Sequence, residues 1–483
     1  MTEVLFEFDT VARKPRIVSD YLDQVRELFS AEDKSLIFLR RRTGRNMPVR
    51  KYAITNKGYF DAPLFQEICK AIKINLPALE IKVSNSFLEH ISTPEISTEL
   101  SLLNVTPRDY QQESAAKAIN KGKGIIVLPT SAGKTLVIAL IAETCLKQQN
   151  FKTLIVVPNI QLVQQTYQDF LDYGVDPKNV SKWSGNCEFQ NTNIVIANDQ
   201  ILLSEKQDKT PLENFDVLIV DECHKLASAE KITKLLKALK YKHKFGFTGS
   251  LPANQYDVWS LNRIFGSVVY YKQSVELRQE KYISKVQAIG LELHYNNIPT
   301  FAKPSMAEPT AGYEEETTWL HTNQFRNTII NKLVSKLQTN TLILVDRIAH
   351  GEHLLEFLNS NNTANKNICF IQGSVEVEER EKIRKLMEET HNVVCIAISK
   401  IFSTGISIKN LHNVVFAAIG KARIKIIQSI GRSLRLHHTK TTATIFDIAD
   451  VCLHYGKRHY EERKELYSSE QILLTQKSFY EQS

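Results

Sequence analysis

The segment that decides the fold is Leu128-Pro-Thr-Ser-Ala-Gly-Lys-Thr135, which lies between the apolar run GIIVL at residues 124–128 and the helical apolar run LVIALIAETCL at residues 136–146. A strand, a loop and a helix in this order are the context of a phosphate-binding loop. Gly133 lets successive backbone N–H groups face one phosphate group, and the helix N-terminus adds a partial positive charge. We expect Lys134 to contact the β- and γ-phosphates of ATP and the Thr135 hydroxyl to hold Mg²⁺. The rest of the loop is expected to line the same site, namely Pro129, Thr130, Ser131 and Ala132.

The loop departs from the general pattern at one position. Leu128 stands six positions before the lysine, where a glycine is usual. The alternative is an ordinary helix start with a chance Gly-Lys-Thr. The intact Gly-Lys-Thr end and its strand–helix context favour the phosphate loop.

A second segment, VLIVDECH at residues 217–224, ends an apolar strand with two adjacent carboxylates. Asp221 at the end of a buried strand can reach the Mg²⁺ shell. Glu222 is suited to polarise the attacking water, and His224 could couple the nucleotide state to other parts of the protein. A solvated turn is the alternative for an isolated Asp-Glu pair. A phosphate loop earlier in the chain favours the nucleotide site.

A third segment, QSIGRSLR at residues 428–435, carries three polar side chains at helical spacing. In a helix Gln428, Arg432 and Arg435 lie on one face, because spacings of three and four residues stack. Guanidinium groups on such a face could stabilise the charge that develops on a transferred phosphoryl group. A solvent-facing basic helix is the alternative.

Together these segments resemble the superfamily 2 helicases and translocases, over about residues 105–455. The resemblance implies an α/β protein with two RecA-like parallel-sheet domains in tandem that bind ATP between them. Two departures are Ser131, where a glycine is usual, and Ser407, where an acidic residue is common. The resemblance also implies roles in adenine recognition for Arg108, Tyr110 and Gln111, in coupling for Thr248, Gly249 and Ser250, in ATP contact for Gly405, and in DNA contact for Pro158, Asn159, Asn198 and Ser399.

Within that superfamily, the strings LPTSAGKT, DECHK and FTGSLP and the short N-terminal region are similar to the UvsW-type branch-migration helicases of bacteriophages. This similarity implies ATP-dependent unwinding and branch migration of forks, D-loops and Holliday junctions, with recombination or replication proteins as possible partners. Three alternatives stay open: an RNA helicase, the motor subunit of a restriction or repair complex, and an ATP-dependent switch that never unwinds.

Alternating apolar strands and amphipathic helices predict two α/β halves, at residues 101–285 and 326–483. Residues 286–325, with three prolines and an acidic run, are interpreted as a connector or an insertion. Residues 1–100 are predicted to form a small α+β domain with strands at 35–40 and 49–54 and a helix at 64–74, and the segment after 456 to be helical. The other predicted strands are at 124–128, 153–157, 194–197, 217–220 and 244–247 in the first half and at 341–345, 368–371, 393–397, 413–417 and 443–447 in the second.

The charge distribution favours a nucleic-acid partner. The formal net charge is +8, and a basic excess attracts polyanions. One cluster is expected at the tip of a hairpin on DNA phosphates, with a solvated loop as the alternative. It consists of Arg40, Arg41, Arg42, Arg45, Arg50 and Lys51.

The same composition gives an expected location. The chain has no apolar stretch long enough to span a membrane and no basic, apolar leader at its start. Its seven cysteines form no CxxC pair, which is typical of reduced thiols in the cytoplasm. We therefore expect a cytoplasmic protein, in the host cytoplasm if it comes from a bacteriophage.

Overall fold

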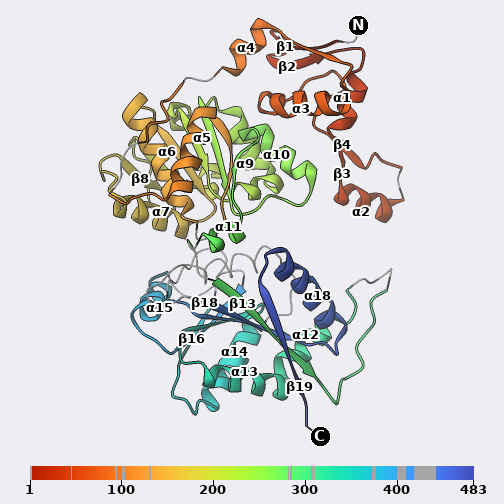
Figure 1. Cartoon of the computed structure of the whole chain (residues 1–483), viewed down its shortest axis with the longest axis vertical. Coiled ribbons are helices and arrows are strands. Elements are labelled where there is room, and N and C mark those ends of the chain that lie inside the picture. The colour runs from red at the N-terminus through yellow and green to blue at the C-terminus, as the bar shows by residue number, and fades with distance from the viewer. Residues whose placement is uncertain are drawn as a thin grey trace. The chain divides into compact units, whose positions relative to one another are not determined.

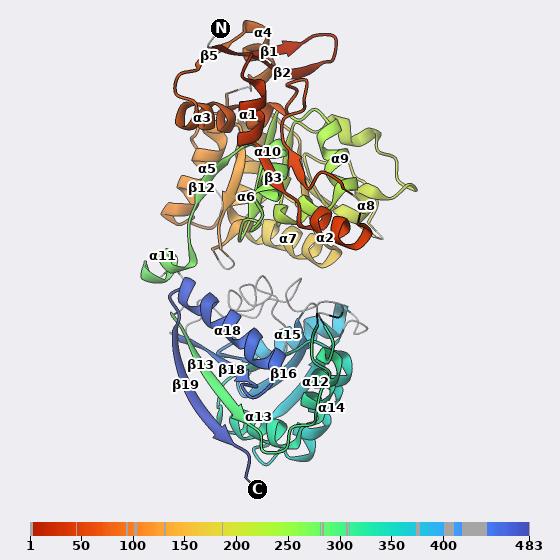
Figure 2. The same cartoon turned by 90° about the vertical axis from the view of Figure 1, so that its right-hand side faces the viewer.

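The computed structural model describes residues 3–44, 46–92, 95–100, 104–129, 132–185, 187–280, 282, 285–305, 308, 310–372, 377–399, 410–417 and 442–482. The chain forms two compact units, one from residues 1–128 and 133–272 and the other from residues 129–132 and 273–483 (Figures 1 and 2). No helix among the described residues is long and apolar enough to cross a membrane.

The first unit is built on a seven-stranded sheet in the order β12-β6-β11-β10-β7-β9-β8, in which every pair of neighbours is parallel. All five strands predicted for this half are present, and β8 and β12 were not predicted. The strands are β6 (Lys123–Val127), β7 (Thr153–Val157), β8 (Val180–Trp183), β9 (Ile194–Asn198), β10 (Val217–Val220), β11 (His243–Thr248) and β12 (Val268–Tyr271).

Helices pack against this sheet because their apolar faces have no other place to be buried. The helix α6 (Lys134–Gln149) is apolar on nearly all sides, and its residues from Leu136 to Leu146 are buried. The core of the unit includes Ile125, Leu154 and Leu218 from three strands. The other helices are α5 (Asp109–Lys121), α7 (Ile160–Asp172), α8 (Asp199–Leu203), α9 (Glu230–Ala238) and α10 (Gln255–Phe265), with the 3-10 turns η2 (Thr210–Asn214) and η3 (Cys223–Ser228).

The N-terminal part of this unit is a small α+β domain, as predicted. It has a three-stranded sheet in the order β2-β1-β5 and a two-stranded sheet of β3 and β4. Its elements are β1 (Glu3–Asp9), β2 (Lys14–Val18), α1 (Leu22–Leu28), β3 (Ser30–Glu32), α2 (Lys34–Thr43), β4 (Arg50–Tyr52), η1 (Ala62–Leu64), α3 (Phe65–Asn75), β5 (Glu80–Val83) and α4 (Asn85–Ile91).

One predicted strand of this domain is wrong. Residues 35–40 lie in the helix α2, at the far end of the arm formed by β3 and β4 (Figure 1). The Asp33 carboxylate accepts a hydrogen bond from the backbone N–H of Leu36 at 3.4 Å, as a residue that caps a helix does. Leucine and arginine, which fill the segment, also have high helix propensity.

The N-terminal domain packs against the helix α10 of the first motor domain. Trp259 of α10 is 5% exposed and belongs to the apolar core of the N-terminal domain. Its indole N–H donates to Glu67 of α3 at 3.1 Å, and the Asn262 amide donates to the same carboxylate at 2.8 Å. Asp61 forms ion pairs with Lys237 at 3.0 Å and Arg263 at 3.5 Å. These contacts join the N-terminal domain and the first motor domain in one compact unit.

The second unit repeats the architecture, with seven parallel strands in the order β15-β16-β14-β17-β18-β13-β19. The five strands predicted for this half are present. The strands are β13 (Lys285–His294), β14 (Thr341–Val345), β15 (Asn367–Ile371), β16 (Val393–Ile398), β17 (Asn413–Phe416), β18 (Thr442–Ala449) and β19 (Leu473–Tyr480). The described helices are α11 (Ser274–Gln279), α12 (Tyr313–Thr322), α13 (Gln324–Lys336), α14 (Ile348–Ser360), α15 (Val377–Glu389) and α18 (His454–Ser469).

The interpretation of residues 286–325 as a connector or insertion is wrong for most of that segment. It begins inside β13, which lies between β18 and β19, and it ends in α12 and the start of α13. Only the part between the strand and α12, where Pro299 and Pro304 stand, lacks a helix or strand among its described residues. The helix expected after residue 456 is α18, and the strand β19 that follows it was not predicted.

Candidate nucleotide site and nucleic-acid interface

The predicted site segments of the first half share one edge of its sheet. Parallel strands all point the same way, so the loops that follow them gather at the carboxyl edge. The strands β6, β11 and β10 are neighbours in the sheet, and the phosphate loop, Thr248 and Asp221 stand at or just beyond their carboxyl ends. Three segments far apart in sequence are therefore brought together.

Lys134 and Glu222 are in direct contact in this site. The lysine ammonium lies 3.3 Å from the carboxylate, with side chains that are 10% and 18% exposed. Gly133, which precedes the helix α6, has φ of +76°, and a Cβ there would lie 2.4 Å from the Gln111 amide nitrogen. A side chain at this position would be strained and would clash, which explains the glycine of the loop. Ala132 is fully buried, and its backbone N–H donates to the carbonyl of Pro129 at 3.1 Å.

The two adjacent carboxylates lie in different electrostatic surroundings. Burial raises the pKa of Asp221 to about 6, and the charge of Glu222 adds to this shift. Burial opposes ionisation of Glu222 as well, but the charges of Lys134 and, to a smaller extent, Lys225 outweigh it and lower the pKa of Glu222. Glu222 therefore carries a negative charge at neutral pH. For Asp221, the nearby cations do not offset the effect of burial, so its pKa stays raised.

Glu222 also has a left-handed backbone, with φ of +50°. This conformation is costly for a residue with a side chain and is found mostly where function requires it. The peptide N–H of Glu222 donates to the Asp221 carboxylate at 2.8 Å, which holds the turn in place. The strained turn directs the two carboxylates to separate positions.

His224 connects the acidic segment to the next strand. Its Nδ1 lies 3.3 Å from the Glu222 carboxylate and 2.9 Å from the Thr248 hydroxyl. The Thr248 hydroxyl in turn donates to the carbonyl of Ser250 at 2.8 Å. Gly249 lies between these two residues in the turn after β11. A continuous polar chain thus runs from Lys134 through Glu222 to the residues expected to couple hydrolysis to movement.

The residues expected at the adenine form the start of α5. The Gln111 side chain accepts a hydrogen bond from the backbone N–H of Arg108 at 2.9 Å, and an Arg108 guanidinium nitrogen donates to the Tyr110 hydroxyl at 3.3 Å. Since Gln111 also lies beside Gly133, this segment packs directly on the phosphate loop. The sequence reasoning missed Lys272, whose ammonium lies 5.4 Å from the centre of the Tyr110 ring. No pattern indicated it, because β12, which ends one residue earlier, was not predicted.

The residues present fit ATP with Mg²⁺. The described residues contain no group of three or more His, Cys, Asp or Glu side chains able to hold a metal by themselves. One half-buried carboxylate, Asp221, and one hydroxyl, Thr135, match the way Mg²⁺ is held by few protein ligands and by substrate phosphates. A nearby divalent cation would also offset the burial that raises the pKa of Asp221.

Most of the residues expected on DNA within the two motor domains have side chains that are buried or already bonded. Asn198 is 1% exposed, and Ser399 is 6% exposed with its hydroxyl bonded to the carbonyl of Val345 at 3.1 Å. Both side chains are buried, because Asn198 ends the buried strand β9 and Ser399 directly follows the buried strand β16. The Asn159 side chain accepts from the backbone N–H of Leu162 at 2.8 Å and caps α7. Pro158 stands in the turn before this cap, at the carboxyl edge.

The basic cluster of the N-terminal domain is divided by the structure. Arg40 and Arg42 are exposed on α2. Arg50 forms an ion pair with Glu27 at 2.8 Å, and Lys51 forms one with Asp33. Arg50 and Lys51 are thus partly neutralised by neighbours, since they lie on β4 and not on a free hairpin tip.

Some expected site residues lie outside the part of the chain that the structure describes. Arg41 belongs to α2, but its side chain is not described. The others are Arg45, Thr130, Ser131, Gly405, Gln428, Arg432 and Arg435.

Two family models match the chain in the order of the two units. Residues 104–253 match "Type III restriction enzyme, res subunit", and residues 325–437 match "Helicase conserved C-terminal domain". The two matches cover the phosphate loop, the acidic pair and the segment QSIGRSLR at residues 428–435.

Individual proteins are similar over most of the chain. The "ATP-dependent DNA helicase uvsW" of Enterobacteria phage T4 is 29% identical over 77% of this chain and 77% of its own length. The "General transcription and DNA repair factor IIH helicase/translocase subunit XPB" of Enterocytozoon bieneusi is 24% identical over 68% of this chain and 55% of its own length. Among solved structures, S. cerevisiae Dbp5 bound to RNA and ADP BeF3 has a TM-score of 0.56 at 11% identity, over 77% of this chain and 90% of that one, and therefore shares the fold alone.

Proposed function

Since this chain is a superfamily 2 helicase that hydrolyses ATP, we propose that it is a DNA motor that unwinds and branch-migrates forked, D-loop and Holliday-junction DNA. The observation that carries the proposal is the polar chain from Lys134 through Glu222 and His224 to Thr248. The contacts along this chain support the proposal, because they join the groups proposed to hydrolyse ATP to the groups proposed to sense the hydrolysis. The similarity to a DNA helicase over 77% of the chain supports DNA as the polymer.

The contact between Lys134 and Glu222 suggests how ATP binding prepares the site. When the phosphates of ATP attract Lys134, the Glu222 carboxylate loses its ion pair. Because the charge of Lys134 is the main cause that lowers the pKa of Glu222, its withdrawal makes the carboxylate more basic and better able to accept a proton from the attacking water. Asp221 and Thr135 would hold Mg²⁺, which supplies charge neutralisation at the phosphates when bound.

The same change reaches Thr248 through His224. Burial lowers the pKa of His224, so its ring is neutral and can donate or accept only one hydrogen bond at Nδ1. A shift of the Glu222 carboxylate therefore alters the His224–Thr248 contact of 2.9 Å. In this proposal the turn that carries Thr248, Gly249 and Ser250 transmits the state of the nucleotide.

The second half of the chain is proposed to complete the site. Gln428, Arg432 and Arg435 would approach the γ-phosphate from one helical face, and Gly405 would contact ATP. The proposed division is an accessory domain at 1–100, an ATP-binding domain up to Lys272, and a helicase C-terminal domain from Gln273 onwards, which follows the two compact units. This division places β13, which the sequence reasoning gave to a connector, in the C-terminal domain.

Strand displacement tests the proposal against a non-unwinding switch. The substrate is a synthetic four-way junction with one labelled strand, incubated with the full chain, Mg²⁺ and ATP or a non-hydrolysable analogue. Release of forked products with ATP alone supports the motor. DNA-stimulated hydrolysis without any displaced strand would instead identify a switch. A labelled RNA duplex is tested in parallel, and displacement of its strand alone would identify an RNA helicase.

A further inference from the structure

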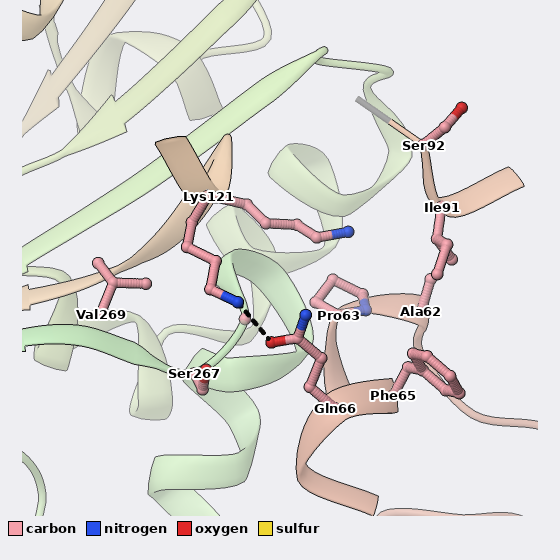
Figure 3. Close-up of a pocket in the computed structure, with 11 residues that line it drawn as sticks. Ala62, Pro63, Phe65, Gln66, Ile91, Ser92, Lys121, Ser267 and Val269 are labelled. Atoms are coloured by element: carbon pink, nitrogen blue, oxygen red, sulfur yellow. Dashed lines mark hydrogen bonds between the residues drawn. The ribbon is translucent and has the colours of Figure 1, made fainter. Parts of the chain in front are cut away.

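A cavity of about 280 Å³ lies between the N-terminal domain and the first motor domain, within the same compact unit. Figure 3 shows Lys121 on the motor side reaching Gln66 of the N-terminal helix α3, with Pro63 and Phe65 beside it and Ile91 and Ser92 across the cavity. The Lys121 ammonium donates to the Gln66 side chain at 3.3 Å. This cavity is separate from the ATP site, because its motor residues stand at the opposite edge of the sheet.

The position of Lys123 shows that separation. Lys123 is the first residue of β6, whereas the phosphate loop follows the last. A strand of five residues spans about 16 Å at about 3.3 Å per residue. A group bound in the cavity therefore lies too far from the ATP site to contact the nucleotide. The cavity would be a second binding site, separate from the ATP site.

The cavity is lined by cations without a matching anion. Lys121 and Lys123 both line it, and no carboxylate belongs to the lining. Among the described residues, neither lysine forms an ion pair. Asp61 and Glu67 flank the lining residues 62–66 in sequence, but both carboxylates have other partners. Asp61 forms ion pairs with Lys237 and Arg263, and Glu67 accepts hydrogen bonds from the side chains of α10.

A third lysine lies next to these two. Lys244 of β11 is the register partner of Lys123, so the two chains carry like charges side by side. Burial, followed by the charges of Lys123 and Lys237, lowers the pKa of Lys244 to about 8. Burial also lowers the pKa of Lys123, and Lys123 together with Lys240 contributes to lowering the pKa of His90, after burial. Like charges crowded in a half-buried place cost free energy, and an anion would relieve that cost.

We propose that this cavity binds a phosphate group, and that the group belongs to the backbone of a duplex arm of the DNA substrate. The cavity is at the lower limit for drug-sized ligands, so it suits one phosphate with its sugar better than a whole cofactor. Lysine ammonium groups and the Ser92 and Ser267 hydroxyls that line it are common phosphate partners. The site deepens the proposed DNA function: it gives the N-terminal domain and the motor a shared grip on DNA, far from the ATP edge.

Lysine protection tests the proposal on the unmodified full chain. Acetylation of Lys121 and Lys123 by a water-soluble active ester is quantified by mass spectrometry with no addition, with forked DNA and with inorganic phosphate, at one ionic strength. We expect DNA to slow the acetylation of both lysines several-fold and to leave the exposed Lys178 and Lys206 unchanged. Equal protection by phosphate alone would support the anion site but assign it to a free phosphate. Protection by neither would overturn the proposal.

A pair of variants provides an independent measurement. Lys121→Gln with Lys123→Gln removes two charges from the cavity, and Lys178→Gln with Lys206→Gln removes two from exposed positions elsewhere. The thermal unfolding midpoint shows whether each variant folds. The cavity variant should bind forked DNA more weakly and should reduce the slope of log affinity against log salt by about one. A slope equal to that of the control would overturn the proposal.

Failure of the cavity proposal can be told apart from failure of the proposed DNA-motor function. DNA that stimulates ATP turnover without protecting the lysines would refute only the cavity. Phosphate that protects the lysines of a protein whose ATP turnover ignores DNA would refute only the DNA motor.

Discussion

At the scale of single residues, the site depends on a few side chains with opposite surroundings. Asp221 and Glu222 are neighbours in sequence, yet burial raises the pKa of the first and nearby cations lower the pKa of the second. The left-handed φ of Glu222 makes this separation possible, because an extended backbone would place the two side chains differently. In the proposed mechanism, Asp221 would hold the metal and Glu222 would contact the attacking water.

Removing the phosphate-loop lysine tests this arrangement. Lys134→Ala should lower ATP turnover by at least about 10²-fold, the usual cost of losing one preorganised charge at a developing anion. Lys147→Ala is a matched control, since Lys147 lies on the same helix and its side chain is 53% exposed and paired with Glu143. Turnover is measured by phosphate release with and without DNA. Equal rates for the two variants would refute the assignment of the loop.

Much of the site at this scale could be predicted from the sequence. Gly133, Lys134, Asp221 and Glu222 stand in patterns whose chemistry requires those residue types. The contact of Lys272 with the Tyr110 ring could not be predicted, because it depends on which strands are neighbours in the sheet. Asn198 was expected on DNA, but whether a side chain at the end of a strand faces a ligand or the core depends on the pleat of that strand.

At the scale of elements, the helix α2 replaces a predicted hairpin. Asp33 caps it, and its exposed face carries Arg40 and Arg42. The pattern of residues 35–40 could not separate strand from helix, because four successive apolar residues fit a short buried strand and a short helix equally well. The cap was visible in the sequence and was the signal that could have decided it.

The position of α2 gives a prediction for DNA binding. Arg40→Glu with Arg42→Glu should weaken DNA affinity and make the dependence of affinity on salt less steep, by about one for each DNA phosphate that the variant no longer neutralises. The control is Lys178→Glu with Lys206→Glu, which reverses the same number of exposed charges outside α2. Fluorescence anisotropy of labelled forked DNA over a range of salt provides the measurement. If the salt dependence of DNA affinity were the same in both variants, α2 would be a solvent-exposed helix that does not contact DNA.

A second prediction at this scale concerns the helices α12 and α14. His321 and His350 stack with ring centres 4.0 Å apart, and both are buried. Burial and then Arg326 lower the pKa of His321 to about 4, and they also lower that of His350 well below its usual value. Arg347 and His353 add positive charge around the pair, and Glu314 opposes it.

The sign of the effect follows from proton uptake. Unfolded histidines take up protons near pH 6.5, whereas folded His321 has a pKa of about 4 and folded His350 has a pKa well below its usual value. The unfolded chain therefore binds more protons in that interval, and stability falls as the pH drops, by up to about 1.4 kcal/mol per pH unit for each histidine. His350→Phe should flatten this dependence in urea unfolding, while the exposed His391→Phe should not. A slope unchanged by His350→Phe would contradict a neutral, buried histidine pair.

At the scale of the whole molecule, the two parallel sheets could be predicted from the sequence. The full set of their strands and the boundaries of the domains could not. Alternating apolar runs predict parallel sheets directly, because such strands are covered on both faces. The strand β13 was missed since it precedes its helices by a long irregular segment and pairs with β18 and β19 at the other end of the chain. The attachment of the N-terminal domain through Trp259 was also beyond the sequence, because nothing near residue 259 indicates a partner among residues 1–100.

In the proposed motor, DNA drives ATP hydrolysis at this site, and branched DNA drives it most. The decisive measurement is steady-state ATP turnover of the full chain with no polymer, single-stranded DNA, a synthetic four-way junction and a structured RNA, at one fixed salt concentration. We expect the highest rate with the junction, a lower rate with single-stranded DNA, and a rate with RNA close to that without polymer. Stimulation by RNA alone would contradict a DNA motor.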